Sequence, residues 1–117
     1  MPEETRLGKV IATKSLENLT DGSTDSEKFS FKRDYHVDAI LFNRDDGQPW
    51  TGSTCTIQVG RTYITEGSTP VSVFGTDWLT HLPVDIDLPA QEEVKVAVTN
   101  NEGTTITVYI TLVMTPK

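Results

Sequence analysis

The chain is poor in the residues on which most catalytic and metal sites depend. Its 117 residues include one cysteine, Cys55, and two histidines, His36 and His81. A lone cysteine excludes an intrachain disulfide, and two separated histidines are too few for a zinc centre. Neither histidine has a neighbouring nucleophile motif, and the chain has no glycine-rich phosphate loop. We therefore expect no catalytic residue, no metal site and no cofactor, and a protein that is not an enzyme.

Basic residues are also scarce. Ten lysines and arginines stand against 17 aspartates and glutamates, which gives a formal net charge of −7 at pH 7. Binding to a nucleic-acid backbone depends on clustered Lys and Arg, and Lys32-Arg33 is the only adjacent basic pair. We expect no nucleic-acid partner, and a charge of this size chiefly favours solubility.

Long apolar runs are missing as well. No stretch approaches the ~20 apolar residues that a membrane-spanning helix requires, so we expect no membrane span. The first residues, Met1-Pro2-Glu3-Glu4-Thr5-Arg6, are acidic and lack the apolar segment of a secretion signal. We expect a protein without such a signal that is made in a cytoplasm.

What the chain does have is alternation of the β type. Val94, Val96 and Val98 alternate with more polar residues, and after the turn sequence Asn100-Asn101-Glu102-Gly103 a second alternating run extends from Ile106 to Met114. A period of two places successive side chains on opposite faces of a strand. The segment predicts a β-hairpin with one apolar face, which other strands must cover.

Further short alternating runs are separated by turn residues. They lie at residues 29–31, 35–43, 54–59, 61–65, 71–74 and 84–88. We predict one all-β domain, a single jelly-roll-like antiparallel β-sandwich of about eight strands, with an immunoglobulin-like sandwich as the nearest alternative. Cys55 falls on the predicted inward face, where a thiol packs as a small apolar group.

The first part of the chain is interpreted as a separate segment. Residues 1–28 are mostly polar and alternate poorly, so we expect an extended N-terminal arm or edge segment ahead of a β-sandwich domain of residues 29–117. Asp21–Asp25 faintly resembles a calcium loop but lacks its closing glutamate, and a plain turn is the favoured interpretation. Subunit contacts are predicted at apolar residues of the arm and of the two-sided run 35–43, namely Val10, Ile11, Ile40 and Phe42.

Three aromatic residues are the candidate binding groups. Trp50 and Trp78 follow turn sequences, and Tyr63 lies in a short strand. Exposed aromatic rings at strand ends stack on sugars or anchor protein interfaces. The alternative is that each tryptophan closes one end of the sandwich. Asp85 and Asp87 share a predicted strand face, and we interpret them as solvated carboxylates rather than metal ligands.

Three segments taken together resemble small jelly-roll capsid-associated proteins of DNA viruses and phages, of the penton, decoration (cement) or head-fibre base type. The segments are Phe29-Ser30-Phe31-Lys32-Arg33-Asp34, Val71-Ser72-Val73-Phe74-Gly75-Thr76-Asp77 and Val94-Lys95-Val96-Ala97-Val98-Thr99-Asn100-Asn101. The resemblance implies a virion structural protein that forms a homo-oligomer, often a trimer or pentamer, and binds the major capsid protein or other virion proteins. It carries over no functional residue.

Two functions are therefore carried forward. The first is a capsid-associated structural protein that stabilises or decorates a virion through oligomeric contacts. The alternative is a carbohydrate- or receptor-binding β-sandwich module, with a glycan bound at Trp50, Trp78 and Tyr63.

Overall fold

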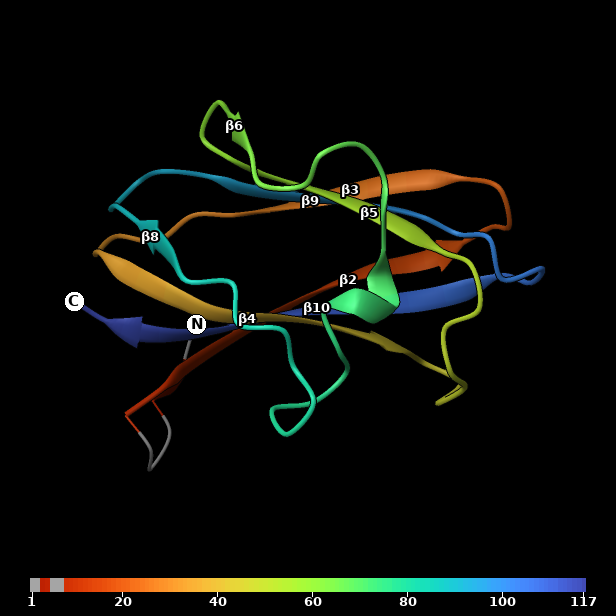
Figure 1. Ribbon diagram of the computed structural model, residues 1–117, viewed down its shortest axis with the longest axis horizontal. Coiled ribbons are helices and arrows are strands. Elements are labelled where there is room, and N and C mark those ends of the chain that lie inside the picture. Colours follow the sequence, from red (N-terminus) through yellow and green to blue (C-terminus); the bar gives the residue numbers. More distant parts are fainter. Residues whose placement is uncertain (1–2, 5–7) are drawn as a thin grey trace.

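In a computed structural model, which describes residues 3–4 and 8–117, the chain folds into two antiparallel β-sheets that face one another (Figure 1). Sheet A contains, in spatial order, β1 (Glu3–Glu4), β2 (Val10–Leu19), β10 (Ile106–Pro116), β4 (Tyr35–Arg44) and β8 (Ile86–Leu88). Sheet B contains, in spatial order, β3 (Thr24–Phe29), β9 (Val94–Thr99), β5 (Thr54–Val59) and β6 (Thr62–Tyr63), with β7 (Thr69–Pro70) also paired to β5. The predicted all-β sandwich is confirmed.

The order in which the strands pair identifies a jelly roll. β2 pairs with β10, β3 with β9, β4 with β8, and β5 with β6 and β7. The first half of the chain is thus paired, in reverse order, with the second half, like a two-stranded ribbon rolled into two facing sheets. Successive strands β2 and β3, β4 and β5, and β8 and β9 lie in opposite sheets, as in a double-sheet jelly roll. The immunoglobulin-like alternative pairs its strands differently and is excluded.

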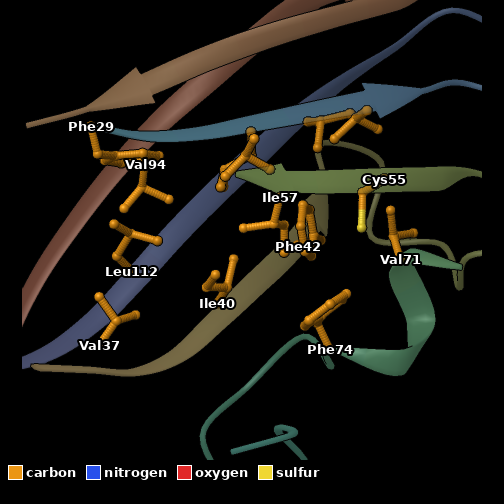
Figure 2. Packing of buried hydrophobic residues seen from close by; sticks show 14 of the residues in the cluster. Phe29, Val37, Ile40, Phe42, Cys55, Ile57, Val71, Phe74, Val94 and Leu112 are labelled. Carbon is orange, nitrogen blue, oxygen red and sulfur yellow. The ribbon is translucent and has the colours of Figure 1, made fainter. Parts of the chain in front are cut away.

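The core lies between the two sheets. Figure 2 shows Ile57 and Val94 of sheet B facing Ile40, Phe42 and Leu112 of sheet A. None of these five side chains is exposed to solvent. Burying a large apolar side chain contributes about 1.5–3 kcal/mol, so this layer is the main source of folding free energy.

The expected boundary between an arm of residues 1–28 and a sandwich of residues 29–117 is not present in the fold. β2 runs along β10 from Met114 to Ile106, and β3 runs along β9 over its whole length. Leu16 and Leu19 of β2 are buried in the same core as Phe29. Glu3–Glu4 form β1, which pairs with β2. Residues 1–2 and 5–7, also part of the expected arm, lie outside the described residues.

A β-bulge explains why the run 35–43 is apolar on both sides. Between Val37 and Ala39, β4 has one residue more than β10, because Met114 pairs with Val37 and Val113 pairs with Ala39. Asp38 is the additional residue, and an extra residue reverses which side chains face inward. Ile40 therefore points into the core, whereas Ala39 lies with Val113 in a small buried cluster on the outer face of sheet A.

The predicted strand at residues 71–74 is wrong, because Val71–Val73 form a 3₁₀ turn, η1. The segment after it covers the edge of β4 that the short β8 leaves unpaired: the carbonyl of Gly75 accepts a hydrogen bond from Phe42 N–H, and Val84 N–H donates to the carbonyl of Asp38. Figure 1 shows the η1–β8 connection reaching past sheet A on the side away from sheet B. Short or covered edges protect a sheet from pairing with other chains.

Candidate functional site

A surface cavity of about 470 Å³ opens beside Trp50. Trp50 is half-buried, and its Nε1 donates a hydrogen bond of 3.0 Å to the carbonyl oxygen of Phe42, which fixes the indole against the core. The cavity is otherwise lined largely by amide and hydroxyl side chains, among them Asn43, Gln48, Ser72, Thr76 and Thr80. An aromatic ring beside amides and hydroxyls suits a neutral, polyhydroxylated ligand.

The loop that follows Trp50 is held by Glu102, which lies in the β9–β10 turn. Its carboxylate accepts hydrogen bonds from the backbone N–H groups of Thr51, Gly52 and Ser53 and from the hydroxyls of Thr51 and Ser53, at 2.6–3.1 Å. Nη1 of Arg44 adds a salt bridge of 2.7 Å, and the Glu102 side chain is 0% exposed. Six donors thus converge on one buried carboxylate, which we call the Glu102 clamp.

The electrostatics of the clamp favour a structural role. Burial by itself would raise the pKa of Glu102, but hydrogen bonds from Ser53, Gly52 and Thr51 outweigh it and lower the pKa to about 2. A carboxyl that stays ionised and fully paired at neutral pH is a poor proton donor or acceptor for catalysis. The clamp positions the Trp50 loop against the β9–β10 turn.

Trp78 lies in a different cavity, of about 330 Å³. Its indole stacks on the imidazole of His81, with ring centroids 4.2 Å apart, and Nζ of Lys9 lies 5.4 Å from the indole centroid. The side chains of His36, Asp38 and Asp85 line the same cavity. Trp78 is 39% exposed, so it does not close an end of the sandwich.

His36 contacts three carboxylates at this place. Its Nε2 lies 2.6 Å from Oδ1 of Asp85 and 3.9 Å from Oδ1 of Asp38, and its Nδ1 lies 3.0 Å from Oδ1 of Asp87. The hydrogen bond to Asp87 is the largest cause that raises the pKa of His36; burial opposes it, and the charges of Asp85 and Asp38 add to it. Asp85 and Asp87 are exposed, as expected, but they are paired with an imidazole that the sequence did not associate with them.

Tyr63 belongs to a third region, where exposed apolar side chains gather. It is 61% exposed and lines a cavity with Thr65 and Glu66, which also line a neighbouring groove of about 310 Å³. Ile64, Val73 and Leu82 line that groove and are themselves exposed. We call the exposed apolar residues of this side the β6–β8 surface: Tyr63, Ile64, Val73 and Leu82.

The three predicted binding residues are therefore not brought together. Trp50, Trp78 and Tyr63 each line a separate cavity, so they do not form one stacking platform. Neither the Glu102 clamp nor the β6–β8 surface was predicted from the sequence. Leu82, an apolar residue in a Thr- and Pro-containing loop, was the signal available for the second.

Three of the four predicted subunit contacts are wrong. Val10, Ile40 and Phe42 are buried in the chain's own core, so their side chains are not available to a second subunit. They are inward-facing because β2 is a core strand and because the bulge at Asp38 reverses the faces of β4. Ile11 is 40% exposed on β2 and stays a prediction.

Other candidate groups take structural places. Cys55 is buried, and burial raises the pKa of its thiol to about 12, so it packs as an apolar group. In the expected turn at Asp21–Asp25, Oδ1 of Asp21 accepts a hydrogen bond from Gly103 N–H at 2.8 Å. Within residues 3–4 and 8–117, no group of three or more His, Cys, Asp or Glu side chains could hold a metal ion. In the same part of the chain, no helix is long and apolar enough to cross a membrane.

Comparison with known proteins adds no relative. No family model, no curated protein and no solved structure matches this chain.

Proposed function

We propose that the protein is a structural subunit of a virion, a capsid-associated jelly roll that assembles into a homo-oligomer and stabilises or decorates the particle. The β6–β8 surface is the observation that carries this proposal. The jelly-roll topology supports it as an analogy, because viral capsid domains commonly use this fold.

The β6–β8 surface gathers exposed large apolar side chains around one groove. Of the eight large apolar side chains that are exposed in the described residues, four lie on this surface. Ile11 and Tyr109 lie on sheet A, and Trp78 and Leu79 lie in the η1–β8 connection. Tyr63 is 61% exposed, although water contact with a large apolar side chain is unfavourable. Contiguous exposed apolar groups mark interaction sites. This surface replaces the expected N-terminal arm as the predicted contact between subunits.

The role of the surface is tested by the molecular mass in solution. Analytical ultracentrifugation of the wild-type protein across a wide concentration range is expected to give an oligomer of defined stoichiometry. Replacing both Val73 and Leu82 with serine removes apolar contact from the groove without touching the buried core, and the variant is expected to sediment as a monomer.

A matched control is available on sheet A. Ile11 is exposed to a similar degree as Leu82 but lies on β2, so Ile11→Ser is expected to leave the oligomer intact. A wild-type chain that stays monomeric at high concentration and does not co-purify with virus particles would remove the proposal. An oligomer that dissociates in Ile11→Ser but not in the groove variant would place the contact on β2.

The cavity beside Trp50 supports a second candidate function, a carbohydrate-binding module. Its lining of one indole with amide and hydroxyl groups is suited to a sugar ring. A glycan array should then give binding that is lost in Trp50→Ala and kept in Trp78→Ala, since Trp78 lines another cavity. Absence of binding, or equal loss in both variants, would end this candidate.

A further inference from the structure

The contacts of His36 define its protonation state. Both ring nitrogens lie at hydrogen-bond distance from a carboxylate oxygen: Nε2 from Asp85 at 2.6 Å and Nδ1 from Asp87 at 3.0 Å. An ionised carboxylate only accepts hydrogen bonds, and a neutral imidazole has a single N–H. Only the doubly protonated imidazolium satisfies both contacts, because the neutral ring would point a lone pair at one of the two carboxylates.

The groups joined by His36 belong to a weakly held edge. β8 pairs with β4 over three residues, Tyr35 to Val37. Asp87 is in the middle of β8, and Asp85, just before it, has a positive φ of 53°, a conformation that Asp tolerates better than most residues. The His36 side chain is thus a second link between β4 and β8, in addition to the short ladder.

We propose that His36 is a pH-sensitive latch: its imidazolium holds β8 and the preceding residues 83–85 against β4, and this edge opens locally when His36 loses its proton. The proposal concerns the single chain and does not depend on the proposed virion role.

The charges around the latch give the direction of its pH dependence. Asp38 of β4 faces His36 at 3.9 Å and is itself bound by Lys9 at 3.1 Å. Lys117, at the end of the chain, binds Asp87 at 2.9 Å, and His81 lines the same cavity. Three carboxylates and two lysines surround His36, so a neutral imidazole leaves an excess of one negative charge. This excess opposes the loss of a proton from His36. Once the proton is lost, the carboxylates repel one another.

The linkage between protonation and folding shows at which pH the His36 contacts stabilise the edge. The pKa of His36 is raised in the folded protein, chiefly by the hydrogen bond to Asp87, so the stabilisation is complete below its ordinary value of 6.5 and is lost as pH rises through the folded value. The pKa of Asp87 is lowered, chiefly by the hydrogen bond to His36, so the latch also weakens in acid as Asp87 is protonated. The latch is strongest between these two titrations.

Nuclear magnetic resonance tests the latch directly. The Cε1–Hε1 signal of His36 is expected to titrate above 6.5, and Asp87→Asn is expected to lower that midpoint. In step with the wild-type titration, hydrogen-exchange protection of Val84 and of the β8 amides, corrected for intrinsic exchange, is expected to fall roughly fivefold, as two partly exposed ion pairs predict. The β9 amides serve as the control and should keep their protection.

Two variants separate the latch from a general loss of stability. Asp85→Asn keeps a residue that tolerates positive φ but removes the charge, and it should reduce the pH dependence of β8 protection. His36→Gln should give, at every pH, the lower protection of the deprotonated wild-type protein. The proposal is overturned by a His36 midpoint at or below 6.5, by a midpoint that Asp87→Asn does not lower, or by β8 protection that does not follow the His36 titration.

Discussion

Replacing Glu102 with glutamine tests how much of the stability depends on one buried carboxylate. The substitution keeps the shape of the side chain but removes its charge and turns one acceptor into a donor. That NH₂ group would face N–H or O–H donors from residues 51–53 or the guanidinium of Arg44. At least one buried hydrogen bond is lost, and Arg44 loses its buried partner.

The expected magnitude follows from the pKa of Glu102. Its folded value of about 2 lies below the ordinary value of 4.5, and at about 1.4 kcal/mol per pKa unit the ionised form contributes about 3 kcal/mol at pH 7. This agrees with the ~3–5 kcal/mol lost when one partner of a buried ion pair is removed. For a chain of this size, about 3 kcal/mol lowers Tm by about 10–15 °C.

The assay is urea unfolding of the wild type and Glu102→Gln at pH 7 and in acid. Folding lowers the pKa of Glu102. The difference in the free energy of unfolding between the two proteins should therefore be largest above pH 4.5 and should shrink as the pH falls toward 2. Glu93→Gln is the matched control, because the Glu93 carboxylate is exposed and makes only a long, solvent-exposed ion pair of 3.8 Å with Lys28. This substitution should change the free energy of unfolding little. A loss of stability below about 1 kcal/mol at pH 7, or one that does not depend on pH, would mean that the ionised Glu102 carboxylate does not stabilise the fold.

Three further predictions concern packing and backbone geometry. Alkylation of Cys55 in the folded protein should proceed only at the rate of unfolding, because the thiol is buried and its pKa is raised to about 12; rapid native-state labelling would contradict this. Phe42→Ala should lower the free energy of unfolding, measured with urea, by about 3–5 kcal/mol, because the ring is fully buried between the sheets. A decrease under about 1 kcal/mol would mean that the core is packed differently. Gly75→Ala should cost more than about 2 kcal/mol, because φ is +91° and a Cβ would lie 2.8 Å from the carbonyl oxygen of Thr80. Gly47→Ala, with positive φ but open space, should cost about 1 kcal/mol, and equal losses in the two glycine variants would contradict the steric argument.

Strands with regular alternation could be predicted from the sequence. In β9, the buried residues are Val94, Val96 and Val98, in the strict period of two that the sequence shows. Cys55 and Ile57 of β5 are buried in the same way. These strands lie inside sheet B with partners on both sides, so side-chain burial alone determines the pattern.

The strands that were misassigned contain irregular pairing. β2 has one residue more than β10 between Leu16 and Leu19, and Asn18 there has a positive φ of 53°. The buried residues of β2 are consequently spaced irregularly, which made the segment look like an arm rather than a core strand. β3 is an edge strand in which Phe29 alone is buried, so its composition is that of a loop.

The candidate sites depended on contacts that no local pattern encodes. Glu102 accepts hydrogen bonds from Thr51, Gly52 and Ser53, which precede it in the chain by 51, 50 and 49 positions. From the sequence, Glu102 was interpreted only as part of a turn. His36 and Asp87 are likewise 51 positions apart. Local periodicity identifies which faces are apolar but not which distant polar groups meet, and fold-level likeness does not define a function.

The proposed homo-oligomer requires that the β6–β8 surface is buried between copies of this chain. Hydrogen–deuterium exchange at low and high protein concentration, resolved along the sequence, measures this directly. We expect the segments around Tyr63, Ile64, Val73 and Leu82 to gain protection as concentration rises, while β2 and β10, on the side of sheet A away from β8, do not change. Protection that does not depend on concentration anywhere, or that rises around Ile11 and Tyr109 instead, would contradict it.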